Sequence, residues 1–298
     1  MTDRLDSAAD PAPTAGATAA HEWMPGFPLG DSGSDGRFDT TAPHPARVYA
    51  YWLGGKDCYE ADRTAAEEVV RLRPQVVASA RANRAFLARL VRYLADDCGV
   101  RQFLDIGTGL PAPDSTHQVA QQVDPACRIV YVDNDPVVLS HARALLNSTP
   151  PGSCGYVDAD LRDTGTILTG AAGTLDLARP VAVLLLAVLN FLTDADDPAK
   201  VVAALAAGLA PGSFLALSHL TADLAPEQVT AAAQAYNTLA PVPVTPRTHA
   251  QVTGLFGGLR LVAPGVVTVS EWRPGHAGEV TAPADLYGGL ATIAAGGR

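Results

Sequence analysis

The chain has 298 residues, of which 48% are hydrophobic and 17% charged, and its mean hydropathy is +0.12. This apolar content is enough for a sizeable core, so the composition excludes a wholly disordered or fibrous chain. The formal net charge is −10 and the isoelectric point is near 5.0, which disfavours a nucleic-acid partner because phosphate binding needs a basic surface.

The sequence carries no sign of a membrane anchor or a secretion signal. Its longest apolar stretch, Val181 to Leu189, is shorter than the roughly 20 residues that span a bilayer. The N-terminus has no basic-then-apolar pattern, so we expect a cytoplasmic protein without a membrane partner. The oligomeric state is left open.

The cysteines indicate neither a zinc site nor a disulfide framework. They form no Cys-X-X-Cys pair and no Cys/His cluster, so we expect reduced thiols and no metal. The four are Cys58, Cys98, Cys127 and Cys154.

The first part of the chain divides into a tail and a helical region. Residues 1–42 are rich in small and polar residues without any periodicity, and such a segment cannot offset its ordering entropy, so we predict a disordered tail. Residues 43–98 predict three helices, with Pro74 in the first turn of the third helix and Asp96 at its end. We interpret these helices as an N-terminal cover.

Residues 99–298 alternate short apolar runs with longer amphipathic segments. Strands separated by helices form βαβ crossovers, so we predict a Rossmann-like, doubly wound α/β domain with a mostly parallel sheet of seven strands. The last two predicted strands lack a helix between them, which favours an antiparallel edge strand. The predicted strands are 101–107, 127–133, 154–160, 181–189, 213–219, 259–264 and 266–272. The predicted helices are 115–123, 136–146, 200–209, 226–239, one capped by Thr245, and one around 284–295.

Carboxylates follow three successive predicted strands, at Asp105, Asp133 and Asp160. In an open α/β sheet the ligand binds beyond the carboxyl ends of the strands, so these residues are candidates for binding. Gly107 and Gly109 let the backbone turn sharply and approach a ligand closely. A carboxylate after the second strand suits the two hydroxyls of a ribose.

Residues 107–112 also fit the dinucleotide fingerprint GxGxx(G/A), which alone is weak evidence. In that motif a helix begins at the glycines, and its N-terminus neutralises a pyrophosphate. Here Pro111 and Pro113 delay the helix to Ser115, and Asp105 would repel a pyrophosphate. A ligand with a cationic ammonium group, such as S-adenosylmethionine, fits better.

The segments FLDIGTGLP, VYVDNDPVVLSHARALL and YVDADLRD resemble class I S-adenosylmethionine-dependent methyltransferases. More narrowly, ARVYAYWLGGKD, RANRAFL, LSH and EWRP resemble an actinobacterial family of uncharacterised methyltransferases. The resemblance extends over residues 43–290. It implies a Rossmann-like fold, S-adenosylmethionine as the cofactor and S-adenosylhomocysteine as the product.

The same resemblance implies a role for each residue at the strand ends. Asp133 accepts the ribose hydroxyls, Asn134 lies beside the adenine, and Asp160 binds the adenine amino group next to Leu161. Asn190 stands where we expect a histidine in relatives, so a base at that position is in doubt. The complete predicted cofactor set is Arg84, Asp105, Gly107, Thr108, Gly109, Asp133, Asn134, Asp160, Leu161 and Asn190.

Several candidates also have a purely structural interpretation. For Gly107 and Gly109 it is a simple turn between strand and helix. For Asp133 it is a cap of the next helix, although Asp135 is the better cap candidate. For Asp160 it is a surface turn.

Three aromatic residues and two arginines of the helical cover also have two interpretations. Arg81 or Arg84 binds the cofactor carboxylate through its planar fork, or both lie on a solvated helix face. Tyr49, Tyr51 and Trp52 pack in the core, or they cover the sulfonium by cation–π attraction.

No catalytic triad is visible, and methyl transfer does not require one. Orientation, proximity and desolvation supply most of the acceleration when the leaving group is already activated. If the acceptor must first lose a proton, His219 and Tyr49 are the candidate bases, although His219 is equally a structural histidine.

The expected acceptor is a small, partly apolar molecule that is methylated on a hydroxyl or carboxyl oxygen. The Asn/Asp-Pro-Pro-Tyr motif associated with amino-group acceptors does not follow the fourth predicted strand. Two other classes stay open: a non-catalytic regulatory module that binds the cofactor or its product, and an NAD-dependent oxidoreductase.

Overall fold

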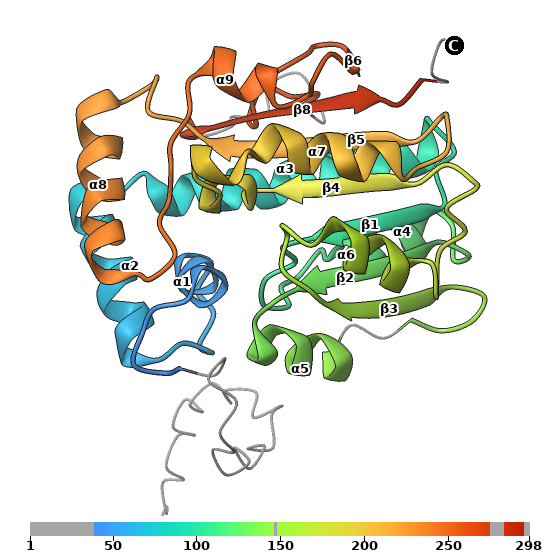
Figure 1. Ribbon diagram of the computed structural model, residues 1–298. Coiled ribbons are helices and arrows are strands. Elements are labelled where there is room, and N and C mark those ends of the chain that lie inside the picture. Colours follow the sequence, from blue (N-terminus) through green and yellow to red (C-terminus); the bar gives the residue numbers. More distant parts are fainter. Residues whose placement is uncertain (1–38, 146–147, 275–282, 295–298) are drawn as a thin grey trace, which may run out of the picture. The chain divides into compact units, whose positions relative to one another are not determined.

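The computed structural model describes residues 39–145, 148–274 and 283–294 (Figure 1). Contacts divide the chain into two units, Met1–Asp35 and Gly36–Arg298, and the described residues all belong to the second unit. The predicted tail lies outside the described residues except for residues 39–42. Among the described residues, no helix is both long enough and apolar enough to cross a membrane.

The centre of this unit is a mostly parallel sheet of eight strands (Figure 1). They are β1 Gln102–Ile106, β2 Arg128–Asp133, β3 Ser153–Asp158, β4 Ala182–Leu186, β5 Phe214–Leu220, β6 Arg260–Leu261, β7 Val267–Thr268 and β8 Leu286–Thr292. Their order is β3-β2-β1-β4-β5-β8-β6, and β7 also pairs with β8. The first five strands are parallel, whereas β8 is antiparallel to β5, so the predicted doubly wound class with an antiparallel strand near one edge is confirmed.

The helices cover both faces of the sheet (Figure 1). They are α1 Pro45–Trp52, α2 Glu60–Leu72, α3 Val76–Asp96, α4 Thr116–Val123, α5 Pro136–Leu145, α6 Thr164–Ala171, α7 Pro198–Ala207, α8 Pro226–Leu239 and α9 His249–Gly254, with short 3-10 turns η1 Leu189–Phe191 and η2 Asp194–Asp196. Alternate side chains of β1 enter opposite layers: Leu104 packs with α6 and α7, and Phe103 packs with α3 and α4.

Three helices form a separate apolar cluster beyond the carboxyl ends of the parallel strands (Figure 1). Val48 of α1, Ala65 and Val69 of α2, and Ala232 and Tyr236 of α8 are buried together. The third helix of the predicted cover, α3, instead shares a core with the sheet. The cover at the strand ends is therefore built from segments that lie far apart in the sequence.

The predicted C-terminal helix around residues 284–295 is wrong, because this segment forms β8 between β5 and β6. Its glycines explain the close packing there: a Cβ at Gly288 would press on Phe86 of α3, and a Cβ at Gly289 would press on Phe256. The sheet has eight strands instead of the predicted seven because β8 joins it, whereas β6 and β7 fall within the two predicted strands 259–264 and 266–272 and are much shorter than expected.

One other helix prediction needs correction, and one helix of the structure was not predicted. The cap of α9 is Thr248, whose hydroxyl accepts from the backbone N–H of Gln251, whereas Thr245 donates its backbone N–H to the carbonyl of Asn190 at 2.8 Å. Helix α6, between β3 and β4, was not predicted; Asp163 caps it by accepting from the backbone N–H of Thr166 at 3.0 Å.

Candidate functional site

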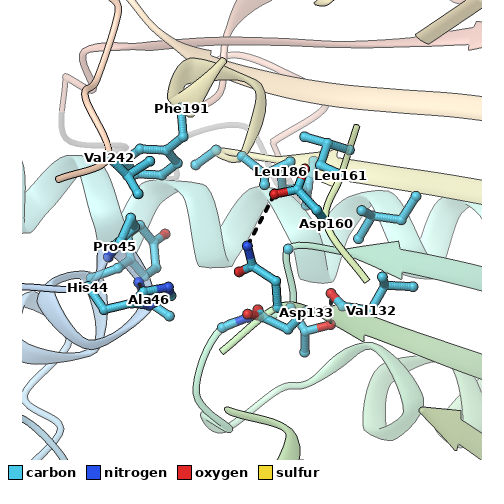
Figure 2. A pocket seen from close by; sticks show the side chains of 18 of the residues that line it. His44, Pro45, Ala46, Val132, Asp133, Asp160, Leu161, Leu186, Phe191 and Val242 are labelled. Atoms are coloured by element: carbon cyan, nitrogen blue, oxygen red, sulfur yellow. Dashed lines mark hydrogen bonds between the residues drawn. The ribbon is translucent and has the colours of Figure 1, made fainter. Parts of the chain in front are cut away.

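A cavity of about 270 Å³ lies at the carboxyl ends of β1, β2 and β4. Figure 2 shows Asp133 and Asp160 on one side of it and His44, Pro45 and Ala46 of the α1 region on the other. The following predicted residues line this cavity: Tyr49, Arg84, Asp105, Gly107, Thr108, Gly109, Asp133, Asn134, Asp160 and Leu161.

The loop after β1 makes a tight turn against the end of β4. Gly107 has φ +74° and Gly109 has φ +67°, a region that favours glycine. A Cβ at Gly107 would also collide with Val188 Cγ2. The Thr108 hydroxyl donates to the Asp105 carbonyl at 3.0 Å and closes the turn. The loop backbone is therefore exposed to the cavity at a position where a side chain does not fit.

Asp105 is a buried carboxylate at the end of β1, with 6% of its surface exposed. The Thr116 hydroxyl at the start of α4 donates to its Oδ2 at 2.6 Å. Burial raises the pKa of Asp105 to about 6, although the Thr116 hydrogen bond and the charge of Arg84 act in the opposite direction. The protonation of this group therefore changes in a physiologically accessible range.

Asp133, at the end of β2, is held by two backbone donors. Its Oδ2 accepts from the N–H of Gly109 at 2.9 Å and its Oδ1 from the N–H of Asp135 at 3.0 Å. Asp135 is the residue that caps α5, because its Oδ1 accepts from the N–H of Val137 at 2.7 Å. Burial raises the pKa of Asp133, opposed by those two backbone hydrogen bonds. A carboxylate oxygen has more than one lone pair, so Asp133 keeps acceptor capacity toward the cavity.

Asp160 and Asn134 meet across the loops after β3 and β2. The Asn134 Nδ2 donates to Asp160 Oδ2 at 3.4 Å, the dashed line in Figure 2. Arg162 donates its backbone N–H to Asp160 Oδ1 at 2.8 Å, and its guanidinium pairs with Asp160 and with Asp196. The sequence analysis did not indicate Arg162, whose positive charge offsets the negative charges of Asp160 and Asp196 at this end of the cavity.

Of the two arginines proposed for a carboxylate, Arg84 lines the cavity and Arg81 is exposed outside it. The Arg84 guanidinium donates to the carbonyls of Pro113 and Asp114 at 3.0 and 3.1 Å. Its Nε is buried and has no hydrogen-bond partner among the described residues. A buried unpaired donor is costly, so this atom suits a bound acceptor.

Tyr49 is the one of the three predicted cover aromatics that lines this cavity. Its hydroxyl donates to the Ala80 carbonyl at 3.0 Å and accepts from Asn83 Nδ2 at 3.1 Å. Asn83 in turn accepts from the Ser218 hydroxyl at 2.7 Å. Burial raises the pKa of Tyr49, so its phenolate is disfavoured and the side chain fixes α1 onto α3.

The other two cover aromatics anchor α1 to α2 instead. Tyr51 donates to Glu67 at 2.8 Å, and the Trp52 indole donates to the Ala66 carbonyl at 3.2 Å.

His219, the other predicted base, does not reach the cavity. Its side chain is fully buried, with Nδ1 2.8 Å from the Leu220 carbonyl and Nε2 2.9 Å from the Arg247 guanidinium. Burial lowers the pKa of His219 to about 4, so the ring is neutral and both nitrogens are occupied. These contacts favour the structural interpretation of His219, because the Arg247 guanidinium covers its Nε2.

Asn190 also lies outside this cavity, on η1, where it is buried against a second cavity. Conversely, the first cavity has walls that the sequence did not indicate: residues 44–46 and residues 241–243. His44 Nδ1 lies 2.9 Å from Asp135, which joins the start of α1 to the loop after β2. Only the residues at the strand ends could be predicted from sequence patterns, because the other lining residues belong to segments far away in the sequence.

Two solved structures are similar to most of the chain. A DUF574 family protein from Streptomyces avermitilis is 44% identical with a TM-score of 0.81, and the match covers 85% of this chain and 98% of that chain. A protein from Thermobifida fusca, named "putative methyltransferase", is 38% identical with a TM-score of 0.79, covering 86% of this chain and 97% of that chain. A comparison with curated proteins gave no match.

A family model described as S-adenosyl methyltransferase matches residues 31–294. This range includes the whole sheet and every predicted cofactor residue. The chain therefore belongs to the S-adenosyl methyltransferase family and is an S-adenosylmethionine-dependent methyltransferase.

Proposed function

We propose that this methyltransferase binds its cofactor in the cavity at the ends of β1, β2 and β4 and methylates a small, partly apolar molecule on oxygen. The observation that carries the proposal is the convergence of Asp105, Asp133 and Arg84 on one cavity. Apolar walls from α1, η1 and residues 241–243 close the same cavity. Such walls suit a small acceptor better than a nucleic acid, in keeping with the net charge of −10.

The polar residues fit the cofactor by charge and hydrogen-bonding capacity. Asp133 offers acceptor lone pairs for the ribose hydroxyls, and Asp105 offers a negative charge for the ammonium group. Arg84, with its unpaired Nε, offers a donor for the carboxylate. Asn134 and Asp160 lie together at the other end, where we assign the adenine. When bound, the cofactor supplies a methyl group already activated on a sulfonium.

The protein's own contribution is to orient the reactants and exclude water. The Tyr49 hydroxyl is committed to Ala80 and Asn83, and His219 lies elsewhere, so neither acts as a base in this assignment. The acceptor hydroxyl then loses its proton to solvent as its oxygen gains the methyl group and the carbon–sulfur bond breaks, and the acceleration comes from holding that oxygen near the methyl group in a largely apolar site.

The cofactor assignment is tested by calorimetric titration of S-adenosylhomocysteine into wild type, Asp133→Ala, Arg84→Ala and Arg81→Ala. We expect Asp133→Ala and Arg84→Ala each to weaken binding by about tenfold or more, because each removes a charge-assisted hydrogen bond. Arg81→Ala is the matched control, one turn away on the same helix and exposed, and its affinity should equal that of wild type. Unchanged affinity in both Asp133→Ala and Arg84→Ala would contradict the assignment of the cofactor site.

The choice of acceptor class needs a separate measurement. Incubation with S-adenosylmethionine and a panel of small hydroxyl, carboxyl and amino compounds should release S-adenosylhomocysteine with the oxygen compounds. Tight cofactor binding without turnover across the panel would instead support the regulatory module. Stabilisation by NAD but not by S-adenosylhomocysteine in a melting experiment would contradict the cofactor assignment.

A further inference from the structure

A second cavity, of about 100 Å³, lies next to the first and opens between α1, α3 and α8. Four residues line both cavities: Pro45, Tyr49, Ala187 and Phe191. The two cavities therefore adjoin along these four residues, which we call the shared wall, and a molecule in the second cavity lies next to the cofactor site.

The wall of the second cavity is almost entirely apolar. Helix α8 contributes Val229, Ala232 and Ala233, and α1 contributes Val48 and Trp52. The two alanines leave space where a larger side chain would fill it. For scale, an apolar cavity of about 150 Å³ binds benzene, so the enclosed part of an occupant here is one small ring or a short branched chain.

Two buried polar atoms in this wall have no hydrogen-bond partner among the described residues: Asn190 Oδ1 and the Tyr236 hydroxyl. Both side chains are 4% exposed, so solvent does not satisfy them. Asn190 Oδ1 is only an acceptor, whereas a tyrosine hydroxyl both donates and accepts. An occupant that carries a hydroxyl group can satisfy Asn190 as a donor.

The charged groups in this wall neutralise each other. Arg73 donates to both carboxylate oxygens of Asp285 at 2.9 Å, and its remaining nitrogen donates to Gln228. The guanidinium is therefore fully engaged and offers little to an anionic occupant. A neutral hydroxyl compound fits this wall better than a carboxylate.

The shared wall is also a place of backbone strain. Ala187, which follows β4, has φ +53°, in a region that costs free energy for a residue with a Cβ. Its N–H is held by the Ser218 hydroxyl at 2.9 Å, and that hydroxyl donates to Asn83, which donates to Tyr49. One buried hydrogen-bond network thus fixes Tyr49 and Ala187, two residues that line both cavities.

From these observations we propose that the second cavity is the methyl-acceptor site and takes a neutral, apolar compound with a hydroxyl group that donates to Asn190. The inference rests on the proposed cofactor site and adds to it the class of acceptor and the residues that select it. Asn190 acts in this assignment as a specificity residue of the acceptor and not as a cofactor ligand.

The test uses phenol, toluene and benzoate as probes, with the full-length protein saturated with S-adenosylhomocysteine and binding followed by ligand-observed NMR. We expect wild type to bind phenol about tenfold more tightly than toluene, which lacks the donor, and also more tightly than benzoate. Asn190→Leu should bind phenol and toluene equally. Ala233→Phe, which fills the cavity, should weaken the binding of phenol by about tenfold or more.

The matched control is Gln234→Phe, the neighbouring exposed position of α8, which should bind phenol like wild type. Retained S-adenosylhomocysteine affinity in Asn190→Leu and Ala233→Phe shows that both variants fold. Phenol binding that is absent in wild type, or unchanged in both cavity variants, overturns the acceptor site while leaving the cofactor site intact. Loss of S-adenosylhomocysteine binding by wild type would instead overturn the proposed function itself.

Discussion

At the end of β1, the Asp105 carboxyl lies buried beside Thr116, and the charges of Arg84 and Asp133, which line the same cavity, act on its pKa in opposite directions. Its raised pKa of about 6 means that the carboxyl gains a proton as the solution becomes mildly acidic. In the cofactor site that we propose, only the ionised form attracts the ammonium group of the cofactor. Occupancy of the cavity should therefore follow the ionisation of this one residue.

We predict that S-adenosylhomocysteine binds about tenfold more weakly at pH 5 than at pH 7.5, because only about one tenth of a carboxyl with pKa 6 is ionised at pH 5. Calorimetry at both pH values measures this ratio. Asp105→Asn should bind weakly at both values and show no such ratio. His44→Gln, which removes another ionisable side chain from the cavity, is the control and should keep the ratio. A pH-independent affinity in wild type would contradict the prediction.

Gly107 and Gly109 permit a second prediction at the scale of single residues. Gly107→Ala introduces both a strained φ and a collision with Val188, whereas Gly109→Ala introduces only the strained φ, with open space around the new Cβ. We expect Gly107→Ala to lower the free energy of unfolding by about 2–4 kcal/mol and Gly109→Ala by about 1–2 kcal/mol. Urea unfolding measures both values, and Gly107→Ala combined with Val188→Ala should recover part of the difference. Equal losses in the two single variants would show that the contact with Val188 is unimportant.

At the scale of elements, α1 is attached through a buried ion pair to the start of α2. Arg47 Nε lies 3.0 Å from Asp62 Oδ2, and both side chains are buried. Asp62 also accepts from the backbone N–H groups of His44 and Tyr59, each at 2.8 Å. One carboxylate therefore holds the N-terminal ends of two helices, one of which walls both cavities.

Removing the Asp62 carboxylate should lower the free energy of unfolding much more than removing an exposed carboxylate. We predict that Asp62→Ala lowers the free energy of unfolding by about 3–5 kcal/mol, because it removes the nearer carboxylate partner of the buried Arg47 and leaves only Asp135, at 3.7 Å. Glu68→Ala, which breaks the exposed pair with Arg71 on the same helix, should cost less than about 1 kcal/mol. Denaturant unfolding of both variants makes the comparison, and similar losses would contradict the role given to Asp62.

The strands β1 to β5 were predictable because each is a short apolar run followed by polar residues. β8 was not, because its Leu, Gly and Ala residues carry little strand signal and its state is fixed by pairing with β5 and β6. α6 was missed because its Gly and Thr residues are poor helix formers, and burial of Ile167 and the Asp163 cap stabilise it instead. The division of the chain at residues 42 and 98 stays a prediction.

At the scale of the whole molecule, the sequence predicted the half of the cavity that lies on the sheet. The ends of parallel strands meet at one edge, so Asp105, Asp133 and Asp160 could be placed together from their positions alone. The opposite half comes from residues 44–46 and 241–243, which no local pattern connects. The same limit explains His219: the sequence placed it at the end of the fifth strand, where β5 contains it, but its coverage by Arg247 is a tertiary contact.

The shared wall of Tyr49 and Ala187 has a thermodynamic consequence. Two molecules that touch the same side chains do not bind independently. When the first molecule orders these side chains, the second no longer bears that cost in conformational entropy. Linkage then requires symmetry: the factor by which the first molecule changes the affinity of the second equals the factor in the reverse direction. In the two sites proposed above, the side chains that border both cavities couple the two binding equilibria.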